Sequence, residues 1–359
     1  MMQLKIKSVS YWKEDMALSR PYAVTYVMHH SVQNLFIKIE ADNGLYGLGA
    51  GSPSKHVTGE LMDDDCSARI PELEGLLVGK DVRELRTIIR SCAHIYAKHP
   101  ALLAALDMAL HDLLCKHLDI SLGRYLGVIH RPLPTSITIG IKSLDETVEE
   151  GLEYKERDFK IIKLKIGQSL EEDIERTIKL REAVGKEMLI RVDANQGYTV
   201  ESLTKYLEET ANADVEFYEQ PMKPSLIEDM FQLPDDVRSI CAADEDLHKH
   251  RDALRILSMG KAFGIYNIKL MKCGGITEAL RIADVAETSD IPLMWGCMDE
   301  SVISISASLN AALACPATQY LDLDGSFDLA KDVATGGFRI EGGVLYPLYD
   351  QPGLGVELK

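Results

Sequence analysis

Residues 160–195 read KIIKLKIGQSLEEDIERTIKLREAVGKEMLIRVDAN, and this stretch decides the fold. A β-rich apolar run at 160–166 is followed by an amphipathic stretch at 170–184 and by a second β-rich run at 189–195. Apolar runs of this length are typical of buried strands, and the longer middle stretch is typical of a helix. The segment therefore predicts two parallel strands joined by a crossover helix.

The middle stretch carries signals that begin and end a helix. Ser169 and Glu172 have the S-x-x-E spacing of a capping box, and Gly185 follows the last helical position. Apolar residues recur on one face at four-residue intervals, and they are Leu170, Ile174 and Ile178. We therefore expect a helix that packs one face against a sheet.

The same alternation extends in both directions along the chain. Eight β-rich runs are separated by stretches that can form helices, and they are residues 135–141, 160–166, 189–195, 217–220, 239–244, 264–270, 292–297 and 319–324. Eight strands with helices between them are typical of a (β/α) barrel. An open, doubly wound sheet is the alternative, although no GxGxxG or GxxxxGK[ST] motif follows the first strand. The sequence favours the barrel.

The chain before the barrel has a different pattern. Strands are expected at residues 3–12, 34–42 and 46–51, a loop at 19–32 and a helix at 99–118. Strands followed by helices, without alternation, predict an α+β unit. We expect this unit at residues 1–125, the barrel at 126–325, and a C-terminal segment at 326–359 that returns to the first unit.

Composition excludes several classes of function. Lys and Arg number 39 and Asp and Glu number 56, which gives a net charge of −17. This excess of negative charge argues against nucleic acid and anionic lipid as partners, and no apolar run reaches the roughly 18–20 residues of a membrane span. The seven cysteines form no CxxC pair, and the N-terminal residues lack a signal-peptide pattern, so we expect a cytoplasmic protein. A homo-oligomer is compatible with these features.

Charged residues stand where the predicted barrel strands end. Period two puts Lys163 and Lys165 on one strand face. On an exposed strand such a pair would be a solvated face, whereas inside a barrel both lysines need counter-charges. Asp193, Glu219 and Asp244 end the next three strands, and helix capping is their structural alternative. Clustered carboxylates repel one another unless a cation holds them, and an all-oxygen site with few ligands suits Mg²⁺.

Lys269 ends the sixth predicted strand, across the barrel from Lys165 on the second. Two lysines on opposite sides of a bound carbon can remove a proton from one face and return it to the other. This role needs an ammonium pKa lowered towards neutrality. We expect the neighbouring Lys163 and a bound cation to have this effect.

These residues together resemble the enolase superfamily, in its muconate-lactonizing subgroup. The matching motifs are Lys163-x-Lys165, Asp193-Ala-Asn195, Glu219-Gln220-Pro221, Ala243-Asp244-Glu245 and Lys269. The superfamily's use of a Lys or His base with Mg²⁺ is a known example. The resemblance covers nearly the whole chain and implies an α/β fold: a modified TIM barrel, (β/α)7β, with an N-terminal α+β capping domain completed by the C-terminal tail.

The resemblance also implies roles and a cofactor. Lys165 and Lys269 would be the two acid/base groups, and Lys163 would stabilise an enolate and lower the pKa of Lys165. Asp193, Glu219 and Asp244 would hold one Mg²⁺ per subunit, with Asn195 and Glu245 contacting these ligands. These positions carry over one by one from the motifs.

Within the subgroup, Asp322-Leu323-Asp324 resembles the D-x-D with which dipeptide epimerases hold the α-ammonium of the substrate. Paired carboxylates on one strand face suit a cationic amine, and a turn-forming Asp pair is the structural alternative. The implied function is a Mg-dependent dipeptide epimerase that inverts the α-carbon of the C-terminal residue.

Residues that would select the substrate are expected in the first loop of the cap and after the seventh predicted strand. Ala-Glu epimerases carry an Arg in the first loop of the cap, and Val27 takes that position here, with Arg20 close by. Cys297, Met298 and Asp299 follow the seventh predicted strand and are further candidates for substrate contact. Solvent-facing loop positions are the alternative for these residues.

Other reactions stay open. Within the subgroup they are N-acylamino acid racemisation, o-succinylbenzoate synthesis and muconate cycloisomerisation. Outside it they are a metal-free Schiff-base aldolase and a non-catalytic interaction module.

Overall fold

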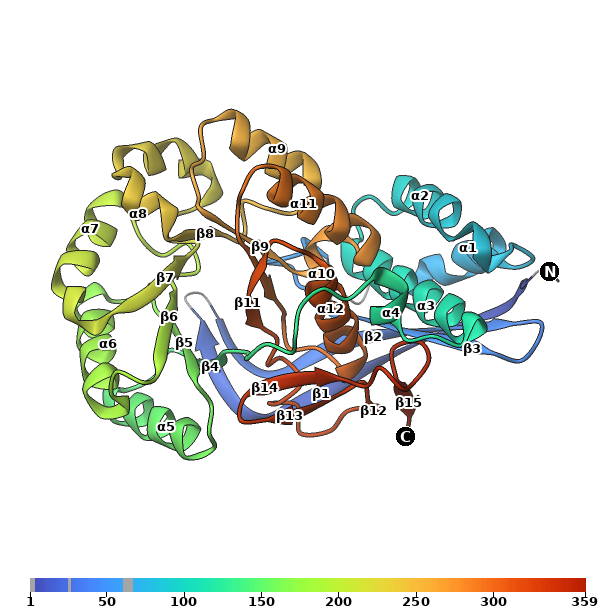
Figure 1. Ribbon diagram of the computed structural model, residues 1–359, viewed down its shortest axis with the longest axis horizontal. Helices are drawn as coiled ribbons and strands as arrows, with labels where there is room; N and C mark the ends of the chain where they lie inside the picture. Colours follow the sequence, from blue (N-terminus) through green and yellow to red (C-terminus); the bar gives the residue numbers. More distant parts are fainter. Residues whose placement is uncertain (1–3, 25–26, 61–66) are drawn as a thin grey trace.

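The computed structural model describes residues 4–24, 27–60 and 67–359. An N-terminal α+β unit lies beside an eight-stranded barrel, and the chain ends near the N-terminal unit (Figure 1). The strands of the N-terminal unit are β1 (Ile6–Val24), β2 (Val27–Ala41) and β3 (Tyr46–Gly51), and its helices are α1 (Ser67–Leu77), α2 (Leu85–Ile95), α3 (Pro100–Leu118) and α4 (Leu122–Leu126). The predicted α+β character of this region and its helix at 99–118 are confirmed.

The predicted barrel is confirmed. Its strands are β4 (Ile137–Ile139), β5 (Ile161–Lys165), β6 (Leu189–Asp193), β7 (Val215–Glu219), β8 (Cys241–Ala243), β9 (Ile265–Ile268), β10 (Leu293–Gly296) and β11 (Thr318–Asp322). They pair in chain order and in parallel. A parallel bridge between Thr135 and Leu321 joins the last strand to the segment before β4, and Ser136 N donates to Leu321 O at 3.1 Å. These bonds close the sheet.

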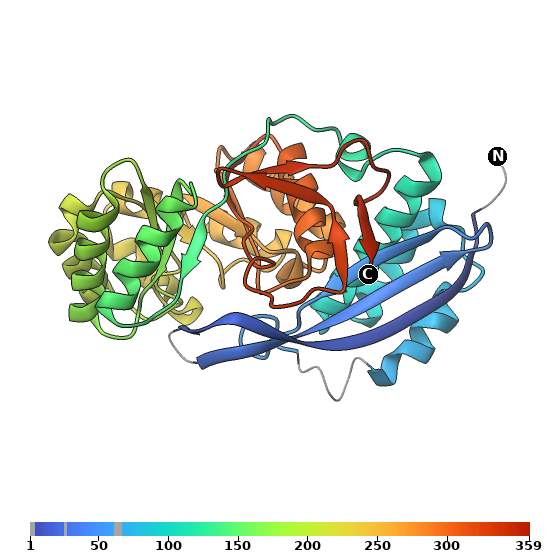
Figure 2. The same cartoon turned by 90° about the horizontal axis from the view of Figure 1, so that it is seen from below.

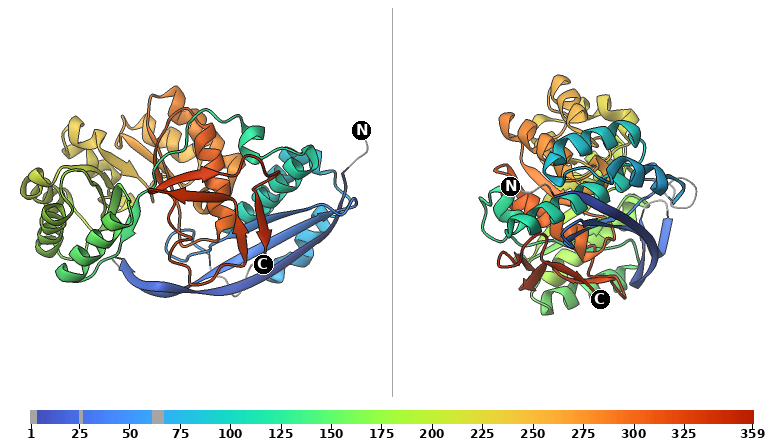
Figure 3. Two further views of the ribbon diagram at one scale, coloured as in Figure 1. Left: turned by 60° about the horizontal axis from the view of Figure 1, so that its bottom comes forward. Right: turned by 90° about the vertical axis from the view of Figure 1, so that its right-hand side faces the viewer.

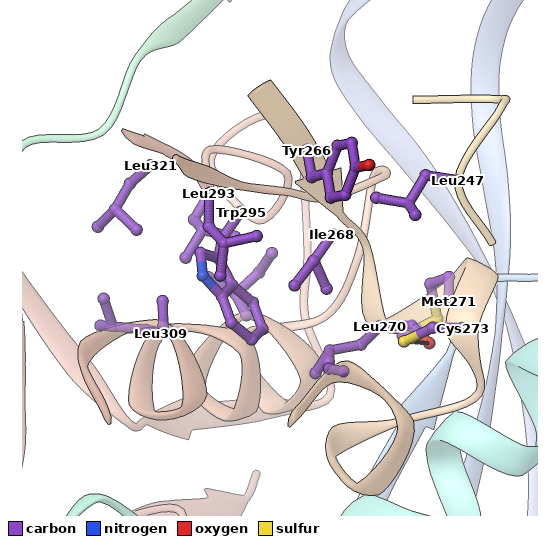
Figure 4. Close-up of a cluster of buried hydrophobic side chains, with 14 of the residues drawn as sticks. Leu247, Tyr266, Ile268, Leu270, Met271, Cys273, Leu293, Trp295, Leu309 and Leu321 are labelled. Atoms are coloured by element: carbon purple, nitrogen blue, oxygen red, sulfur yellow. Dashed lines mark hydrogen bonds between the residues drawn. The ribbon is translucent and has the colours of Figure 1, made fainter. Parts of the chain in front are cut away.

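Helices cover the outside of the barrel. They are α5 (Leu144–Glu156), α6 (Leu170–Val184), α7 (Val200–Glu209), α8 (Asp235–Ser239), α9 (His250–Ser258), α10 (Leu270–Cys273), α11 (Ile276–Thr288) and α12 (Val302–Ala314), with 3₁₀ segments at Ala211–Ala213 and Pro224–Gln232. A further 3₁₀ segment, Val82–Glu84, precedes α2 in the N-terminal unit. The core between sheet and helices is apolar (Figure 4). Trp295 of β10 is fully buried there, and its indole N–H donates to Thr318 Oγ1 at 2.9 Å.

The predicted capping box at the start of α6 is wrong, although the helix is present with the predicted bounds. Ser169 is the N-cap residue but makes no side-chain capping bond. Asp173 of the first turn instead accepts a hydrogen bond from Gly167 N at 2.7 Å and pairs with Arg176. The strand-to-helix turn is therefore held by the carboxylate of Asp173 rather than by the hydroxyl of Ser169.

The predicted loop at residues 19–32 is also wrong. Residues 19–24 belong to β1 and residues 27–32 belong to β2, and the ladder continues to the pair Val24 and Val27. Pro21 lies in the register shift between Ala17 and Tyr22, which is a position where a strand tolerates proline. The long hairpin extends under the barrel (Figure 2).

The hairpin is fixed to the barrel by backbone hydrogen bonds. Ser19 N donates to Asp328 O at 2.7 Å, and Ala330 N donates to Ala17 O at 2.9 Å. Residues 328 and 330 follow the predicted ammonium-binding acids, of which Asp322 ends β11 and Asp324 lies just after it. The N-terminal unit thus reaches the mouth of the barrel.

Helix α3 packs directly on β3 because that strand presents glycines. A Cβ atom on Gly49 would lie 1.8 Å from Ala105 O, and one on Gly47 would lie 2.0 Å from Ala109 O. Side chains larger than hydrogen would therefore separate the helix from the sheet. This packing fixes the position of the sheet against α3.

The tail forms four short strands, which are β12 (Ala334–Gly336), β13 (Phe338–Glu341), β14 (Val344–Pro347) and β15 (Val356–Leu358). It lies beside the N-terminal unit (Figure 3). Leu122 N donates to Gly353 O at 2.7 Å, and Leu354 N donates to Asp112 Oδ1 at 2.8 Å. The domain limits at residues 125 and 325 stay predictions. Within the described ranges, no helix is long and apolar enough to cross a membrane.

Candidate functional site

The charged ends of the barrel strands meet at Lys163 of β5. Its Nζ atom lies 2.7 Å from Glu219 Oε2 and 3.2 Å from Asp193 Oδ2. It also donates to Asp322 Oδ2 at 2.8 Å. Only 2% of Lys163 is exposed, so this ammonium group is stabilised by three carboxylates rather than by water. The solvated-face alternative for this lysine is therefore excluded.

The two predicted acid/base lysines lie on opposite sides of the barrel. Lys165 ends β5, and Lys269 follows β9, four strands further along a closed sheet of eight. The Nζ of Lys165 is 2.6 Å from Asp193 Oδ2, and the Nζ of Lys269 is 2.6 Å from Asp244 Oδ2. Both lysines line the same cavity. The two lysines thus reach one cavity from opposite sides of the barrel.

Lys272 is a site residue that the sequence reasoning missed. It is 1% exposed, and its Nζ donates to the backbone oxygen of Asp244 at 2.5 Å and pairs with the carboxylate of the same residue. Asn267 was missed as well, and its Nδ2 donates to Glu219 Oε1 at 2.8 Å. The signal for Lys272 was its place three residues after Lys269, which is one helical turn.

Burial and crowding of charge shift the pKa values of the carboxylates in different directions. Burial and the charge of Asp193 raise the pKa of Glu219 to about 8. Burial also acts to raise the pKa of Asp193, but Lys165 and Lys163 outweigh it and lower this pKa to about 2. The lysines therefore stabilise the ionised form of Asp193 more strongly than that of Glu219.

The predicted lowering of the lysine pKa depends on a bound cation and stays a prediction. At Lys269, burial acts to lower the pKa, but the carboxylates of Asp244 and Glu219 outweigh burial and raise the pKa above its ordinary value. The physical reason is that carboxylates dominate the surroundings of this ammonium group. A bound divalent cation would offset the charges of these carboxylates and would act to lower the lysine pKa.

The donor set fits a hard divalent cation, although ammonium groups now link the acids. In the described part of the chain, no three His, Cys, Asp or Glu side chains are already arranged as metal ligands. Asp193, Glu219 and Asp244 are nonetheless buried oxygen donors, and Asn195 Oδ1 and Glu245 Oε2 are buried without a hydrogen-bond donor. A divalent cation would bind such unpaired oxygen atoms and would stabilise the ionised form of Glu219, the carboxylate with the raised pKa.

The residues after β6 and β7 have strained backbones. Asn195, Gln196 and Gln220 have φ values of 40°, 69° and 33°, in a region that costs L-residues free energy and clusters at functional sites. Asn195 N donates to Asp193 Oδ1 at 2.9 Å, and Gln196 Nε2 donates to Glu245 Oε1 at 2.9 Å. Asn195 and Glu245 thus lie next to the acids, as the sequence led us to expect.

Asp322 and Asp324 lie at the end of β11 in different surroundings. Asp322 is bound by Lys163 and by Ser136 Oγ, which donates to Asp322 Oδ1 at 2.5 Å. Asp324 Oδ2 accepts from Thr138 N at 2.7 Å, and burial together with Asp322 raises the pKa of Asp324 to about 7. Both acids line a second cavity beside the lysines, where Asp324 is the one without a lysine partner among the described residues.

The loop after β10 divides the two cavities. Cys297, Met298 and Asp299 line both of them, together with Lys165. The backbone oxygen of Asp299 accepts from Asn34 Nδ2 and from Ser52 Oγ, each at 3.2 Å. The structure thus brings these three loop residues to the site, and residues of the N-terminal unit hold the loop in place.

Val27 and Arg20 are the two positions in the first cap segment considered for binding an acidic side chain of the substrate, and neither offers a free positive charge. The side chain of Val27 lies outside the described residues. Arg20 is bound by Glu153, at 2.6 Å from NH2 to Oε1, and lies 3.6 Å from Glu150. The hydrogen bond that Arg20 donates to Glu153 raises the pKa of Arg20. Its charge is therefore already balanced within the protein.

The sequence matches two known family models and is similar to characterised enzymes. Residues 7–127 match the model of the mandelate racemase / muconate lactonizing enzyme N-terminal domain, and residues 145–359 match that of the enolase C-terminal domain-like family. An L-Lys-D/L-Arg epimerase of Desulforapulum autotrophicum is 49% identical over 99% of both chains. An L-Lys-D/L-Arg epimerase of Methylococcus capsulatus is 45% identical over 98% of this chain and 99% of its own.

Solved structures agree with the sequence comparison. A dipeptide epimerase from Methylococcus capsulatus, in complex with Mg and the dipeptide L-Arg-D-Lys, superposes with a TM-score of 0.95 at 45% identity. The match covers 98% of this chain and 99% of that one. The similarity therefore extends over the N-terminal unit, the barrel and the tail together.

Proposed function

Because the chain belongs to the mandelate racemase / muconate lactonizing enzyme family of the enolase superfamily, we propose that it is a Mg-dependent dipeptide epimerase. It is an isomerase acting on amino-acid derivatives. The proposed reaction moves one proton at the α-carbon of the C-terminal residue. The observation that carries the proposal is the pair Lys165 and Lys269, which line one cavity from opposite sides of the barrel.

Opposed bases are what inversion of a stereocentre requires. A base on one face of the α-carbon removes the proton, and an acid on the other face returns one. In this protein Lys165 would serve one stereoisomer as base and the other as acid, and Lys269 would do the converse. The anion between the two steps needs positive charge nearby, and the buried ammonium group of Lys163 supports that role.

Asp193, Glu219 and Asp244 would hold the Mg²⁺ ion. The chemistry that Mg²⁺ supplies when bound is stabilisation of negative charge on the substrate carboxylate as the enolate forms. Asn195 would orient Asp193 through the hydrogen bond from its backbone N–H, and Glu245, held by Gln196, would lie beside these acids. Lys272 would keep the carboxylate of Asp244 ionised and pointed into the site, because it binds that residue through both its side chain and its backbone oxygen.

Asp324, with Asp322 behind it, would bind the free α-ammonium group of the dipeptide. Asp324 lines the cavity, and its Oδ2 atom is fixed by Thr138 N. Asp322 is engaged by Lys163, so it would act mainly through its charge. A dipeptide would then lie with its amino end at β11 and its α-carbon between the two lysines.

Dipeptides with Lys or Arg side chains are the proposed substrates. The 45–49% identical relatives are L-Lys-D/L-Arg epimerases. The charge of Arg20 is balanced by Glu150 and Glu153, so Arg20 is not free to bind an acidic side chain. Asp299 lines both cavities and would receive a cationic one.

The test is to incubate the protein with Mg²⁺ and a library of L,L-dipeptides in D₂O and to follow mass spectra. We expect a gain of one mass unit in the C-terminal residue, strongest for dipeptides of Lys and Arg. Labelling of N-succinyl amino acids, with no labelling of free dipeptides, would replace the proposal by an acylamino acid racemase. No labelling in either set would refute proton transfer of this kind.

A further inference from the structure

Asn34 of β2 connects the N-terminal sheet to the loop that divides the two cavities. Its side chain is fully buried, and its Nδ2 donates to Asp299 O at 3.2 Å while its Oδ1 accepts from Ser301 N at 3.2 Å. A carbonyl and an N–H two residues apart are the groups that a neighbouring strand would bind. The amide of Asn34 thus substitutes for a strand at the edge of this loop.

The sheet that carries Asn34 is firmly fixed at this point. Asn34 pairs with Glu14 of β1, and the next residue, Leu35, pairs with Gly51 of β3. Asn34 therefore lies beside the end of β3, and its side chain comes from a backbone held by ladder hydrogen bonds. A side chain on such a support can set the position of a loop.

The two ends of the loop are held by different parts of the molecule. Asp332 binds the far end, with Ser301 Oγ at 2.8 Å and Val302 N at 2.7 Å. At the near end, the Asp299 carbonyl accepts hydrogen bonds from Asn34 Nδ2 and from Ser52 Oγ. Both of these donors belong to the N-terminal unit, whereas the N–H of the same peptide, that of Glu300, donates to Gly325 O at 3.2 Å.

We propose that Asn34 is a positioning residue for substrate selection, which holds residues 299–301 so that the Asp299 carboxylate stays at the boundary of the two cavities. There it faces a cationic side chain of the dipeptide. This role rests on the proposed function and deepens it, because it assigns the choice of charge to a contact between cap and barrel. Asn34 touches no reacting atom and acts through Asp299.

The test is a double-mutant cycle of Asn34→Ala and Asp299→Asn, with kcat and KM measured for L-Arg-L-Lys and for L-Leu-L-Tyr. We expect Asn34→Ala to lower kcat/KM for L-Arg-L-Lys by about 3- to 10-fold, the range of one or two neutral hydrogen bonds, mainly through KM. The loss for L-Leu-L-Tyr should be clearly smaller. In the Asp299→Asn background the selective loss should vanish, because the two residues act as one unit.

A matched control is Asn310→Ala, since Asn310 is also buried and its Nδ2 donates to a backbone oxygen, Ser306 O, at 2.8 Å. This variant should change thermal stability without changing the preference between the two dipeptides. Ser52→Ala removes the other bond to the Asp299 carbonyl and should shift the preference in the same direction by less. It also tests the role if Asn34→Ala does not fold.

The outcomes separate this role from the proposed function. Equal losses for both dipeptides, or additive effects in the cycle, overturn the role of Asn34 while wild-type turnover supports the epimerase. Wild-type protein that epimerises neither dipeptide overturns the proposed function and this role together.

Discussion

Replacing Asp324 by asparagine removes one negative charge from the cavity and leaves the shape of the side chain unchanged. The amide oxygen can still accept the hydrogen bond from Thr138 N, which is 2.7 Å from Asp324 Oδ2. What is lost is the charge that would bind the α-ammonium group of a dipeptide. A hydrogen bond between charged groups contributes about 1.5–3 kcal/mol, so we expect kcat/KM for a free dipeptide to fall about 10- to 150-fold.

The same residue predicts a pH dependence. Burial and Asp322 raise the pKa of Asp324 to about 7, so the carboxylate becomes ionised as the pH rises through neutrality. For a free dipeptide, kcat/KM should therefore increase between pH 5.5 and roughly 7.5. This range lies below the pKa of the α-amino group, so the substrate keeps its ammonium charge while Asp324 becomes ionised. Asp324→Asn should lose this part of the increase.

The matched control lies in the substrate. An N-acetylated dipeptide has no ammonium group, so it should be a poor substrate of the wild type and should lose little further with Asp324→Asn. The assay is polarimetry or chiral chromatography of both substrates with both proteins across the pH range. Equal effects of the substitution on free and acetylated dipeptides would refute the assignment of Asp324 to the ammonium group.

Three further predictions concern the metal, the buried ion pair and the packing of the cap. Removal of divalent cations with EDTA should abolish epimerisation and Mg²⁺ should restore it, whereas full activity of metal-free protein would contradict the assignment of the acids. Lys272→Met should lower the free energy of unfolding by about 3 kcal/mol in urea denaturation, because a buried carboxylate, that of Asp244, loses one of its ammonium partners; an unchanged midpoint would contradict this. Gly49→Ala should lower the free energy of unfolding by about 3 kcal/mol or prevent folding, since its Cβ would lie 1.8 Å from Ala105 O. A calorimetric Tm within 2 °C of wild type would contradict this, because it would show that α3 can move away from the sheet without loss of stability.

The barrel and its charged strand ends were predictable because they depend on local pattern. Runs such as 160–166 alternate with amphipathic stretches at regular intervals, and parallel strands bring their carboxyl ends to one face. Lys163 and Glu219 thus come together from positions that each carry their own signal in the sequence. No knowledge of side-chain contacts was needed for this step.

The remaining features depend on contacts between distant segments. The strand at residues 19–24 extends only because it has a partner in β2 and a support after β11, and Pro21 gave the opposite signal. The bond between Asn34 and Asp299 joins residues 265 positions apart, and no spacing rule predicts it. The raised pKa of Lys269 follows from how many carboxylates surround it, which becomes known only with the fold.

The central claim is that Lys165 and Lys269 serve opposite faces of one α-carbon, and exchange in D₂O tests it most directly. The L,L and L,D forms of one dipeptide are incubated separately with the wild type, Lys165→Ala and Lys269→Ala, and deuterium at the C-terminal α-carbon is followed by NMR. We predict that wild type labels and interconverts both forms, that neither variant interconverts them, and that any residual exchange in each variant is confined to one form, a different form for each. A general base or acid contributes about 10²–10⁴-fold, so the loss of interconversion should be at least of this size. Near wild-type interconversion of both forms by either variant would contradict the two-base account.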